Sequence, residues 1–113
     1  MVKNMGGDSN SSIQELKELV GKFVHDREWE KFHNPKDLAE AICIEAAELL
    51  EVFQWMSSDE AVRQIDDSSK LERIEEELAD VLVYCLSLAN VTGIDLANAV
   101  ANKLNKNLSL IHI

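Results

Sequence analysis

The sequence predicts an all-α protein, and three observations lead to this fold class. Apolar residues recur at helical spacing in four stretches of the chain. Aromatic residues are few, and the only proline is Pro35, a composition that suits helices better than a sandwich of short strands. The polar segments between the four stretches are short. Four helices joined in this way predict an antiparallel four-helix bundle.

The first predicted helix follows a polar N-terminal segment. Residues 1–11 are rich in Gly, Ser and Asp and lack an apolar run, so they are expected to form a disordered leader and not a signal peptide. Ser12 followed by Glu15 is a capping-box pattern. Apolar residues at helical spacing then continue to about Trp29, which predicts a helix over this stretch.

Asn34 and Pro35 mark the start of the second predicted helix. Asn can cap a helix and Pro suits its first position, so we expect a helix from Pro35 to about Met56. Residues 57–69 are polar and acidic and predict a loop with one short helical turn around residues 61–65.

The third predicted helix is opened by Ser69, which forms a capping box with Glu72, and continues to about Val91. Gly93 is expected to end it, because Gly tolerates the left-handed conformation found after helices. A shorter fourth helix is predicted from residue 94 to about residue 107.

The predicted helices make one domain, residues 12–107, followed by a tail of residues 108–113. A chain of 113 residues is long enough for one core and too short for two. Four short helices bury little area by themselves, so we expect the bundle to be completed by oligomerisation.

Acidic residues outnumber basic residues by 21 to 11, which leaves a formal charge of -10. Such a surface repels phosphate backbones, so binding of a nucleic-acid polymer is not expected. No segment reaches the ~20 apolar residues of a membrane helix, so no membrane partner is expected. Cys43 and Cys85 lie in apolar stretches without a CxxC pair and are expected to be buried thiols of a cytoplasmic protein.

The second predicted helix carries an acidic side chain inside its apolar face. At 100° per residue, Glu45 falls within the apolar stripe and Glu48 falls at its edge. Glu40 and Glu51 project to the opposite side. An ionised carboxylate directed at a core is costly unless it is paired or bound to a metal. The stripe itself consists of Leu38, Ile42, Leu49, Val52, Phe53 and Met56.

The third predicted helix repeats this pattern. Residues 78–91 are apolar almost all round, which predicts the central and most buried helix. Glu77 nevertheless lies between Tyr84 and Val81 in angle around the helix, and Asp80 lies one turn before Tyr84. The nearby Glu72, Glu75 and Glu76 are interpreted differently, as a solvated acidic run.

Glu45 and Glu48 are three residues apart, as are Glu77 and Asp80, so each pair projects from one helix face. If the two helices pack face to face, the four carboxylates converge. Oxygen ligands without His or Cys suit Mg²⁺ or Mn²⁺. A di-iron bundle would want Glu-x-x-His pairs, and neither pair ends in His.

Several segments carry a resemblance to a known family, namely WEKFHNP (29–35), IEAAEL (44–49), FQW (53–55) and EELADV (76–81). From about Ile13 to Asn107 the chain resembles the all-α MazG-like nucleoside triphosphate pyrophosphohydrolases, and most of all the dCTP pyrophosphatases. The ExxE and ExxD spacing is moderately specific alone, and the WExFH and FQW segments make it specific. Residues 108–113 depart from the basic, Tyr-Pro-containing tail of the family.

The resemblance implies hydrolysis of a nucleoside triphosphate to the monophosphate and pyrophosphate, as a house-cleaning activity. The expected substrate is dCTP or a related or modified deoxynucleotide, and the expected assembly is a dimer or tetramer. The implied cofactor is Mg²⁺, with Mn²⁺ as a possible substitute, held by Glu45, Glu48, Glu77 and Asp80. The implied substrate contacts are Trp29, His33, Trp55, Tyr84, Lys103 and Asn107.

This chemistry needs no protein nucleophile, because Mg²⁺ lowers the pKa of a bound water. Glu48, at the edge of the stripe, is the candidate general base. No Walker-type glycine loop is present, so phosphate binding is expected to depend on the metal.

Simpler explanations stay open at this point. Trp29, Trp55 and Tyr84 would also suit a core, and His33 would suit a surface loop. Two other functions also stay open. A non-catalytic acidic interaction module predicts no Mg²⁺ effect and no pyrophosphate release. A phosphoribosyl-nucleotide pyrophosphatase would share the metal site but not the base pocket, and the WExFH and FQW segments argue against it.

Overall fold

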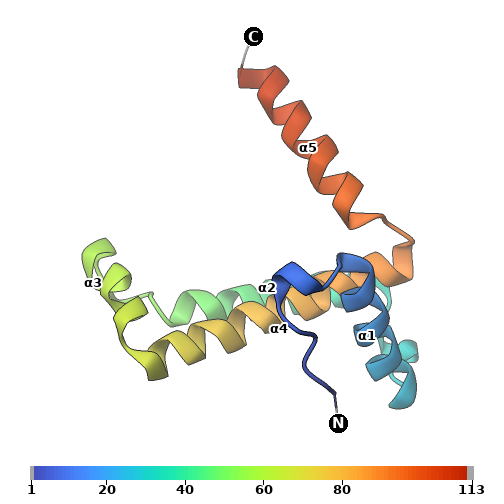
Figure 1. Cartoon of the computed structure of the whole chain (residues 1–113), viewed down its shortest axis with the longest axis horizontal. Helices are drawn as coiled ribbons and strands as arrows, with labels where there is room; N and C mark the ends of the chain where they lie inside the picture. Colours follow the sequence, from blue (N-terminus) through green and yellow to red (C-terminus); the bar gives the residue numbers. More distant parts are fainter. Residues whose placement is uncertain (1, 112–113) are drawn as a thin grey trace.

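The computed structural model describes residues 2–111, with side chains described for residues 2–108, and it confirms the all-α class. Five α-helices and three 3-10 turns follow one another along this part of the chain, and it contains no strand (Figure 1). The α-helices are α1 (Ile13–Asp26), α2 (Pro35–Glu51), α3 (Ser58–Arg63), α4 (Ser68–Thr92) and α5 (Leu96–Ile111). The 3-10 turns are η1 (Asp8–Asn10), η2 (Glu30–Phe32) and η3 (Gln64–Asp66).

Side-chain caps fix the starts of α1 and α2 where the sequence predicts them. The Ser12 hydroxyl accepts a hydrogen bond from the Glu15 backbone N–H at 3.1 Å. The Asn34 side-chain oxygen accepts one from the Asp37 N–H at 2.9 Å, and Pro35 occupies the first helical position. The two helices end earlier than predicted, at residues 26 and 51, because turns follow them directly.

The start of α4 differs from the prediction. Its cap is Asp67, whose carboxylate accepts hydrogen bonds from the N–H groups of Ser69 at 3.1 Å and Lys70 at 3.3 Å. The predicted capping box of Ser69 with Glu72 was therefore wrong. A carboxylate is favoured at this position because it also meets the positive end of the helix dipole. Gly93 ends α4 with φ 72°, in the left-handed conformation that was predicted.

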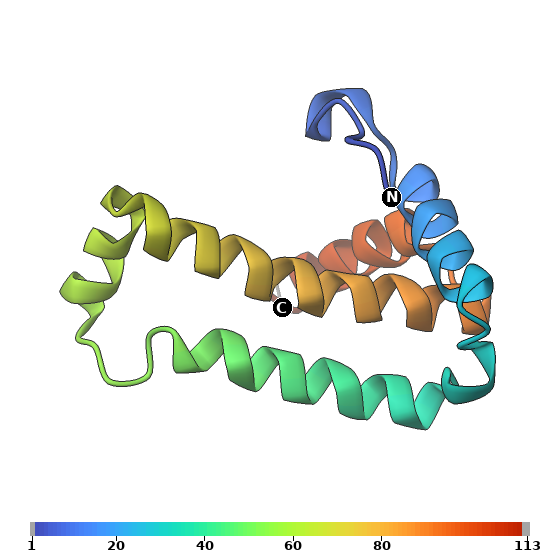
Figure 2. The ribbon, with the colours of Figure 1, turned by 90° about the horizontal axis from the view of Figure 1, so that it is seen from below.

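The core forms where α4 packs against both α1 and α2. α2 and α4 run antiparallel and side by side, and α1 crosses the C-terminal half of α4 (Figure 2). Val20 and Val24 of α1 pack against Leu86 of α4. The apolar stripe predicted for the second helix is confirmed, because all of its members are buried or half-buried. The central position predicted for the third helix is confirmed as well.

The burial predicted all round the third helix is wrong for this single chain. Leu78, Leu82 and Val91 of this stretch are exposed. Cys43 is exposed on α2, which contradicts its predicted burial, and Cys85 is only half-buried. Within the described residues, the last helix does not return to pack along α2 and α4.

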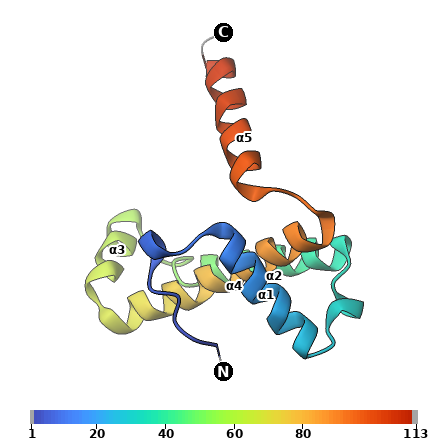
Figure 3. The same cartoon turned by 45° about the vertical axis from the view of Figure 1, so that its right-hand side comes forward.

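α5 leaves the other helices after the turn at Gly93. α4 and α5 meet at a bend of 101°, and α5 projects away from the rest of the chain (Figures 1 and 3). One chain therefore does not close the predicted four-helix bundle. α5 also extends to Ile111, beyond the predicted end near residue 107, and the last two residues of the predicted tail lie outside the described part.

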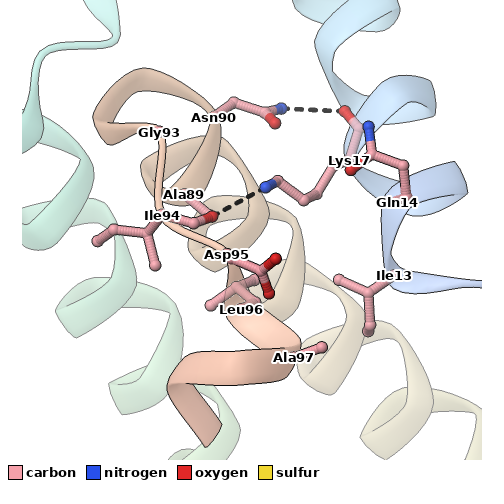
Figure 4. Close-up of a pocket in the computed structure, with 10 residues that line it drawn as sticks. All are labelled: Ile13, Gln14, Lys17, Ala89, Asn90, Gly93, Ile94, Asp95, Leu96 and Ala97. Carbon is pink, nitrogen blue, oxygen red and sulfur yellow. Dashed lines mark hydrogen bonds between the residues drawn. The ribbon is translucent and has the colours of Figure 1, made fainter.

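Two hydrogen bonds tie the turn between α4 and α5 to α1 (Figure 4). The Lys17 ammonium donates to the Ile94 carbonyl oxygen at 2.9 Å, and the Asn90 side-chain amide donates to the Lys17 carbonyl oxygen at 3.0 Å. They border a cavity of about 390 Å³ at this junction. Because they connect three elements, these bonds help to set the direction in which α5 leaves.

Within residues 2–111, no single helix has both the length and the apolar composition to cross a membrane. α4 and α5 meet these requirements only when they are taken together as a bent pair.

Candidate metal centre

Three acidic side chains meet between α2 and α4. Glu45 and Glu48 come from α2 and Glu77 comes from α4, and one carboxylate oxygen of each lies within 4.8 Å of the others. The antiparallel packing of the two helices brings the predicted i,i+3 pair on α2 opposite Glu77. Three of the four predicted ligands are therefore close enough to share one ion.

The carboxylates of this cluster differ in their exposure to water. Glu45 and Glu77 are half-buried, and the Oε2 atom of each is buried without a hydrogen-bond partner among the described residues. Glu48 is exposed. Such buried oxygen atoms are uncommon in native structures and call for an ion or a water that satisfies them.

Burial and mutual repulsion oppose ionisation of the cluster. Burial raises the pKa of the Glu45 carboxyl above its ordinary value, and the neighbouring Glu48 raises it further. Burial also raises the pKa of Glu77, and the charges of Glu48 and Asp80 add to this effect. Arg73 acts on Glu77 in the opposite direction. A bound cation would reverse this balance by favouring the ionised carboxylates.

Asp80 lies beside the cluster and not within it. Its side chain is exposed and borders an apolar cavity of about 330 Å³ between α1 and α4. The charge of Asp80 nevertheless raises the pKa values of both Glu45 and Glu77, so it contributes to the same electrostatic field. The other residues around this cavity are Val2, Leu19, Val20, Phe23 and Val83.

The donor set of the cluster fits a hard divalent cation. Its oxygens come only from carboxylates, which are the ligands that Mg²⁺ and Mn²⁺ prefer in proteins. An ion at this point would neutralise the repulsion and would supply a partner for the buried oxygen atoms of Glu45 and Glu77. The residues present therefore fit the metal that the sequence implied.

Three of the predicted substrate residues lie toward the η2 end of the α2–α4 pair. Trp29 precedes η2 and packs edge-on against Phe23 of α1, with ring centroids 5.8 Å apart. His33 directly follows η2 and is half-buried. Tyr84 is half-buried on α4, one turn beyond Asp80.

The remaining predicted substrate residues do not lie at the η2 end of the α2–α4 pair. Trp55 follows the C-terminal end of α2 and its side chain is 89% exposed. His33 precedes the other end of α2, whose 17 residues span about 25 Å at 1.5 Å per residue. Lys103 and Asn107 are exposed on the projecting α5 (Figure 3). Within one chain these three residues are remote from His33.

One buried polar residue of α4, Ser87, was not among the site residues predicted from the sequence. Ser87 is 3% exposed, and its hydroxyl has no hydrogen-bond partner among the described residues. A signal was available, because Ser87 is a polar residue inside the apolar stretch of residues 78–91, as Asp80 is. Because serine is small and uncharged, the pattern does not distinguish a buried Ser87 from an exposed one.

Comparisons with known proteins agree with this geometry. Residues 41–113 match the model of the MazG-like family. The chain is 36% identical over 96 residues to rat dCTP pyrophosphatase 1 and 35% identical over 96 residues to the human protein of that name. Both matches cover 85% of this chain and 56% of the relative, so the chain spans little more than half the length of these relatives.

A solved structure shares the fold as well. The crystal structure of a pyrophosphatase from Archaeoglobus fulgidus superposes with a TM-score of 0.78 at 45% sequence identity. The likeness covers 84% of this chain and 87% of that chain. Since the family model covers more than half of the chain and the acidic residues of its centre converge, the chain belongs to the MazG-like family.

Proposed function

We propose that the chain is a metal-dependent pyrophosphohydrolase that cleaves a nucleoside triphosphate to the monophosphate and pyrophosphate. The observation that carries this proposal is the convergence of Glu45, Glu48 and Glu77, with two buried oxygen atoms that have no hydrogen-bond partner in the described part of the chain. The names of its relatives, dCTP pyrophosphatase 1 and a pyrophosphatase, support the same reaction class.

Glu45, Glu48 and Glu77 would hold the metal, with Asp80 completing the ligand set from the next turn of α4. When bound, Mg²⁺ supplies positive charge for the phosphate oxygens and acidity for an attacking water. Glu48 is the proposed general base, because its carboxylate is the exposed member of the cluster and can accept a proton from a water that approaches from solvent.

The proposed substrate is dCTP or a related deoxynucleotide. With its phosphates at the carboxylate cluster, the nucleotide would extend along α4 toward η2. Tyr84 lies on this path, and Trp29 and His33 lie near its end. The formal charge of -10 favours a substrate that arrives with its own divalent cation over a nucleic-acid polymer.

We also propose a homo-oligomer, a dimer or a tetramer. Val100, Leu104 and Leu108 form an exposed apolar stripe on the projecting α5, at a spacing of four residues. Leu78 and Leu82 form exposed apolar surface on α4. A second copy that packs against these surfaces would bury both of them. In such an assembly, Trp55, Lys103 or Asn107 of one copy would reach the nucleotide site of the other.

A product assay tests the proposed reaction. Purified protein with Mg²⁺ and a panel of deoxynucleoside triphosphates should release pyrophosphate and the monophosphate, resolved by ³¹P NMR. Glu48→Gln should abolish the release, whereas Glu40→Gln, an exposed residue of the same helix outside the cluster, should not change it. Orthophosphate as the first product would contradict the reaction. Absence of both turnover and any Mg²⁺ effect would instead favour a non-catalytic acidic interaction module.

A further inference from the structure

A cavity of about 730 Å³ lies between α1 and the N-terminal segment, residues 2–5. Its volume falls within the range of about 300–1,000 Å³ that is typical of small-molecule sites. The N-terminal segment lines one side, and one face of α1 with the following Arg27 lines the other. Most of this lining is apolar, with charged side chains among the apolar ones. No member of the carboxylate cluster borders the cavity, so it is a separate place on the molecule.

A turn at Gly6 and Gly7 returns the N-terminal segment along α1. The two glycines have φ angles of 86° and 93°, a backbone conformation that residues with a side chain rarely adopt. The Ser11 hydroxyl donates a hydrogen bond to the Met5 carbonyl oxygen at 3.0 Å, and the Asn10 side-chain amide donates to the Gly6 carbonyl oxygen at 3.2 Å. Local geometry therefore holds this wall of the cavity in place.

Arg27 presents an oriented cationic group to the cavity. Its guanidinium lies over the Phe23 ring, 3.5 Å from the ring centroid, and its Nη1 atom donates to the Phe23 carbonyl oxygen at 3.2 Å. Stacking and hydrogen bonding together fix the plane of the guanidinium. A guanidinium has five N–H donors, and Arg27 forms no ion pair with any residue from 2 to 108. Donors of Arg27 are therefore available to an anion.

Positive charge is concentrated at this cavity, although the formal charge of the whole chain is -10. Lys3, Lys22 and Arg27 line it, and the one acidic residue of the lining is Asp26. Lys22 and Asp26 form an ion pair at 2.9 Å and neutralise each other. Lys3 has no ion-pair partner in the described part of the chain, so Lys3 and Arg27 are left as unpaired cations. An occupant that complements this lining has an anionic group and an apolar body.

We propose that this cavity binds a small amphiphilic anion, with its carboxylate or phosphate group at Arg27 and Lys3 and its apolar body against the apolar lining. The planar fork of an arginine can bind a carboxylate or phosphate through two parallel hydrogen bonds. Burial of the apolar body adds a contribution that inorganic anions cannot supply. The proposal is independent of the proposed reaction, because it uses none of the residues assigned to the metal or to the nucleotide.

Calorimetric titration of the whole chain with three matched compounds tests the two parts of this proposal. 1-Naphthoate carries both an apolar body and an anionic group, 1-naphthalenemethanol carries only the apolar body, and inorganic phosphate carries only the charge. Naphthoate should bind saturably and at least about tenfold more tightly than either of the other two, since hydrogen bonds to charged groups are the strong ones. Equal affinities for naphthoate and naphthalenemethanol would overturn the proposal, because the cations would then take no part.

Substitutions locate the bound anion. Arg27→Gln should weaken naphthoate binding by about tenfold or more, and Arg27→Lys, which keeps the charge without the planar fork, by a smaller factor. Lys3→Gln should weaken it by about twofold to fivefold, as expected for one exposed charge. Arg63→Gln, the same change at an exposed position of α3 outside the cavity, should leave the affinity at its wild-type value. If Arg27→Gln does not fold, Lys3→Gln still reports on the site.

Two results would overturn the site outright. Wild type that does not bind naphthoate would show that the cavity has no such ligand, and unchanged affinity in both Lys3→Gln and Arg27→Gln would place the bound anion elsewhere. Sedimentation with vesicles of phosphatidylglycerol and phosphatidylcholine distinguishes a soluble ligand from a lipid. Binding to these vesicles without binding of naphthoate would favour a membrane surface and overturn the proposed soluble ligand.

Discussion

Two places on α4 present buried oxygen atoms that lack a hydrogen-bond partner within residues 2–108, and the two places differ in charge. At Glu77 the atom belongs to a carboxylate that faces Glu45 and Glu48, whereas at Ser87 it belongs to a neutral hydroxyl beside a small cavity. A charge that leaves water costs far more than a hydroxyl does, and here the repulsion between carboxylates adds to that cost. The first place would therefore gain most from a cation, while the second needs only a hydrogen-bonding group.

The comparison predicts different consequences of substitution at the two places. Under the proposed function, charge neutralisation and water activation belong to the cluster, so substitutions there should affect turnover and metal-linked stability. Ser87 lies outside the cluster, so its substitution should leave the metal site intact.

The largest expected effect is the loss of turnover at the cluster. Glu77→Gln should reduce kcat for dCTP by more than about a hundredfold, because even groups that only orient metal ligands contribute about tenfold to a hundredfold. Ser87→Ala should reduce kcat by less than about threefold, since it removes one neutral hydroxyl that lies outside the carboxylate cluster. Pyrophosphate release under saturating dCTP measures both. Equal losses of kcat would remove the distinction between the two places.

The second largest expected effect is the dependence of folding stability on Mg²⁺. Mg²⁺ at a hundredfold excess over Kd should stabilise the folded protein by about 2.7 kcal/mol, provided that it binds only the folded state. Glu45→Gln removes one charge of the cluster at similar volume. This variant should melt at or above wild type in EDTA, yet lose most of the rise in Tm that Mg²⁺ produces. Equal rises in both proteins would mean that Glu45 is not a ligand.

A smaller effect is expected at Gly21, which lies inside α1 and borders the Ser87 cavity. A Cβ atom there would meet the Asn90 side-chain nitrogen at 3.5 Å, an ordinary contact. Gly21→Ala should therefore stabilise the protein by about 0.5–1 kcal/mol through the better helix propensity of Ala. Urea denaturation measures the free energy of unfolding, and an unchanged or lower value would mean that the added methyl group is not accommodated beside Asn90.

The smallest effect is a pH dependence of stability in the absence of metal. The pKa values of Glu45 and Glu77 are raised on folding, so the folded state binds protons more readily than the unfolded state. This contribution to stability is complete below the ordinary glutamate value of 4.5 and is lost as the pH rises through the raised values. The lowered pKa values of Asp26 and Asp67 act with the opposite sign, below about their ordinary value of 3.8.

Melting curves in EDTA at about pH 5 and about pH 7 measure this slope. Wild type should lose more stability than Glu45→Gln between the two pH values, because the variant lacks one of the groups with a raised pKa. Parallel curves for the two proteins would show that Glu45 ionises as freely in the folded state as in the unfolded state.

The sequence by itself determined the helices and the main feature of the candidate site. The caps at Ser12 and Asn34 and the left-handed Gly93 depend on backbone and side-chain geometry within a few residues. Helical spacing also fixes which side chains share a face, and for this reason the meeting of Glu45 and Glu48 with Glu77 could be predicted. The Asp67 cap was missed because a neighbouring serine offered a similar local pattern.

Only the tertiary structure decided where these faces lie relative to one another. The direction of α5, the separation of Trp55 from His33 and the exposure of Cys43 all depend on how whole helices pack. The cavity at Ser87 likewise exists because α4 meets α1 and η2 there, and α4 is far from both in the chain. Periodicity specifies the buried face of each helix but not its partner or its crossing angle, which are set by side-chain packing between segments remote in sequence.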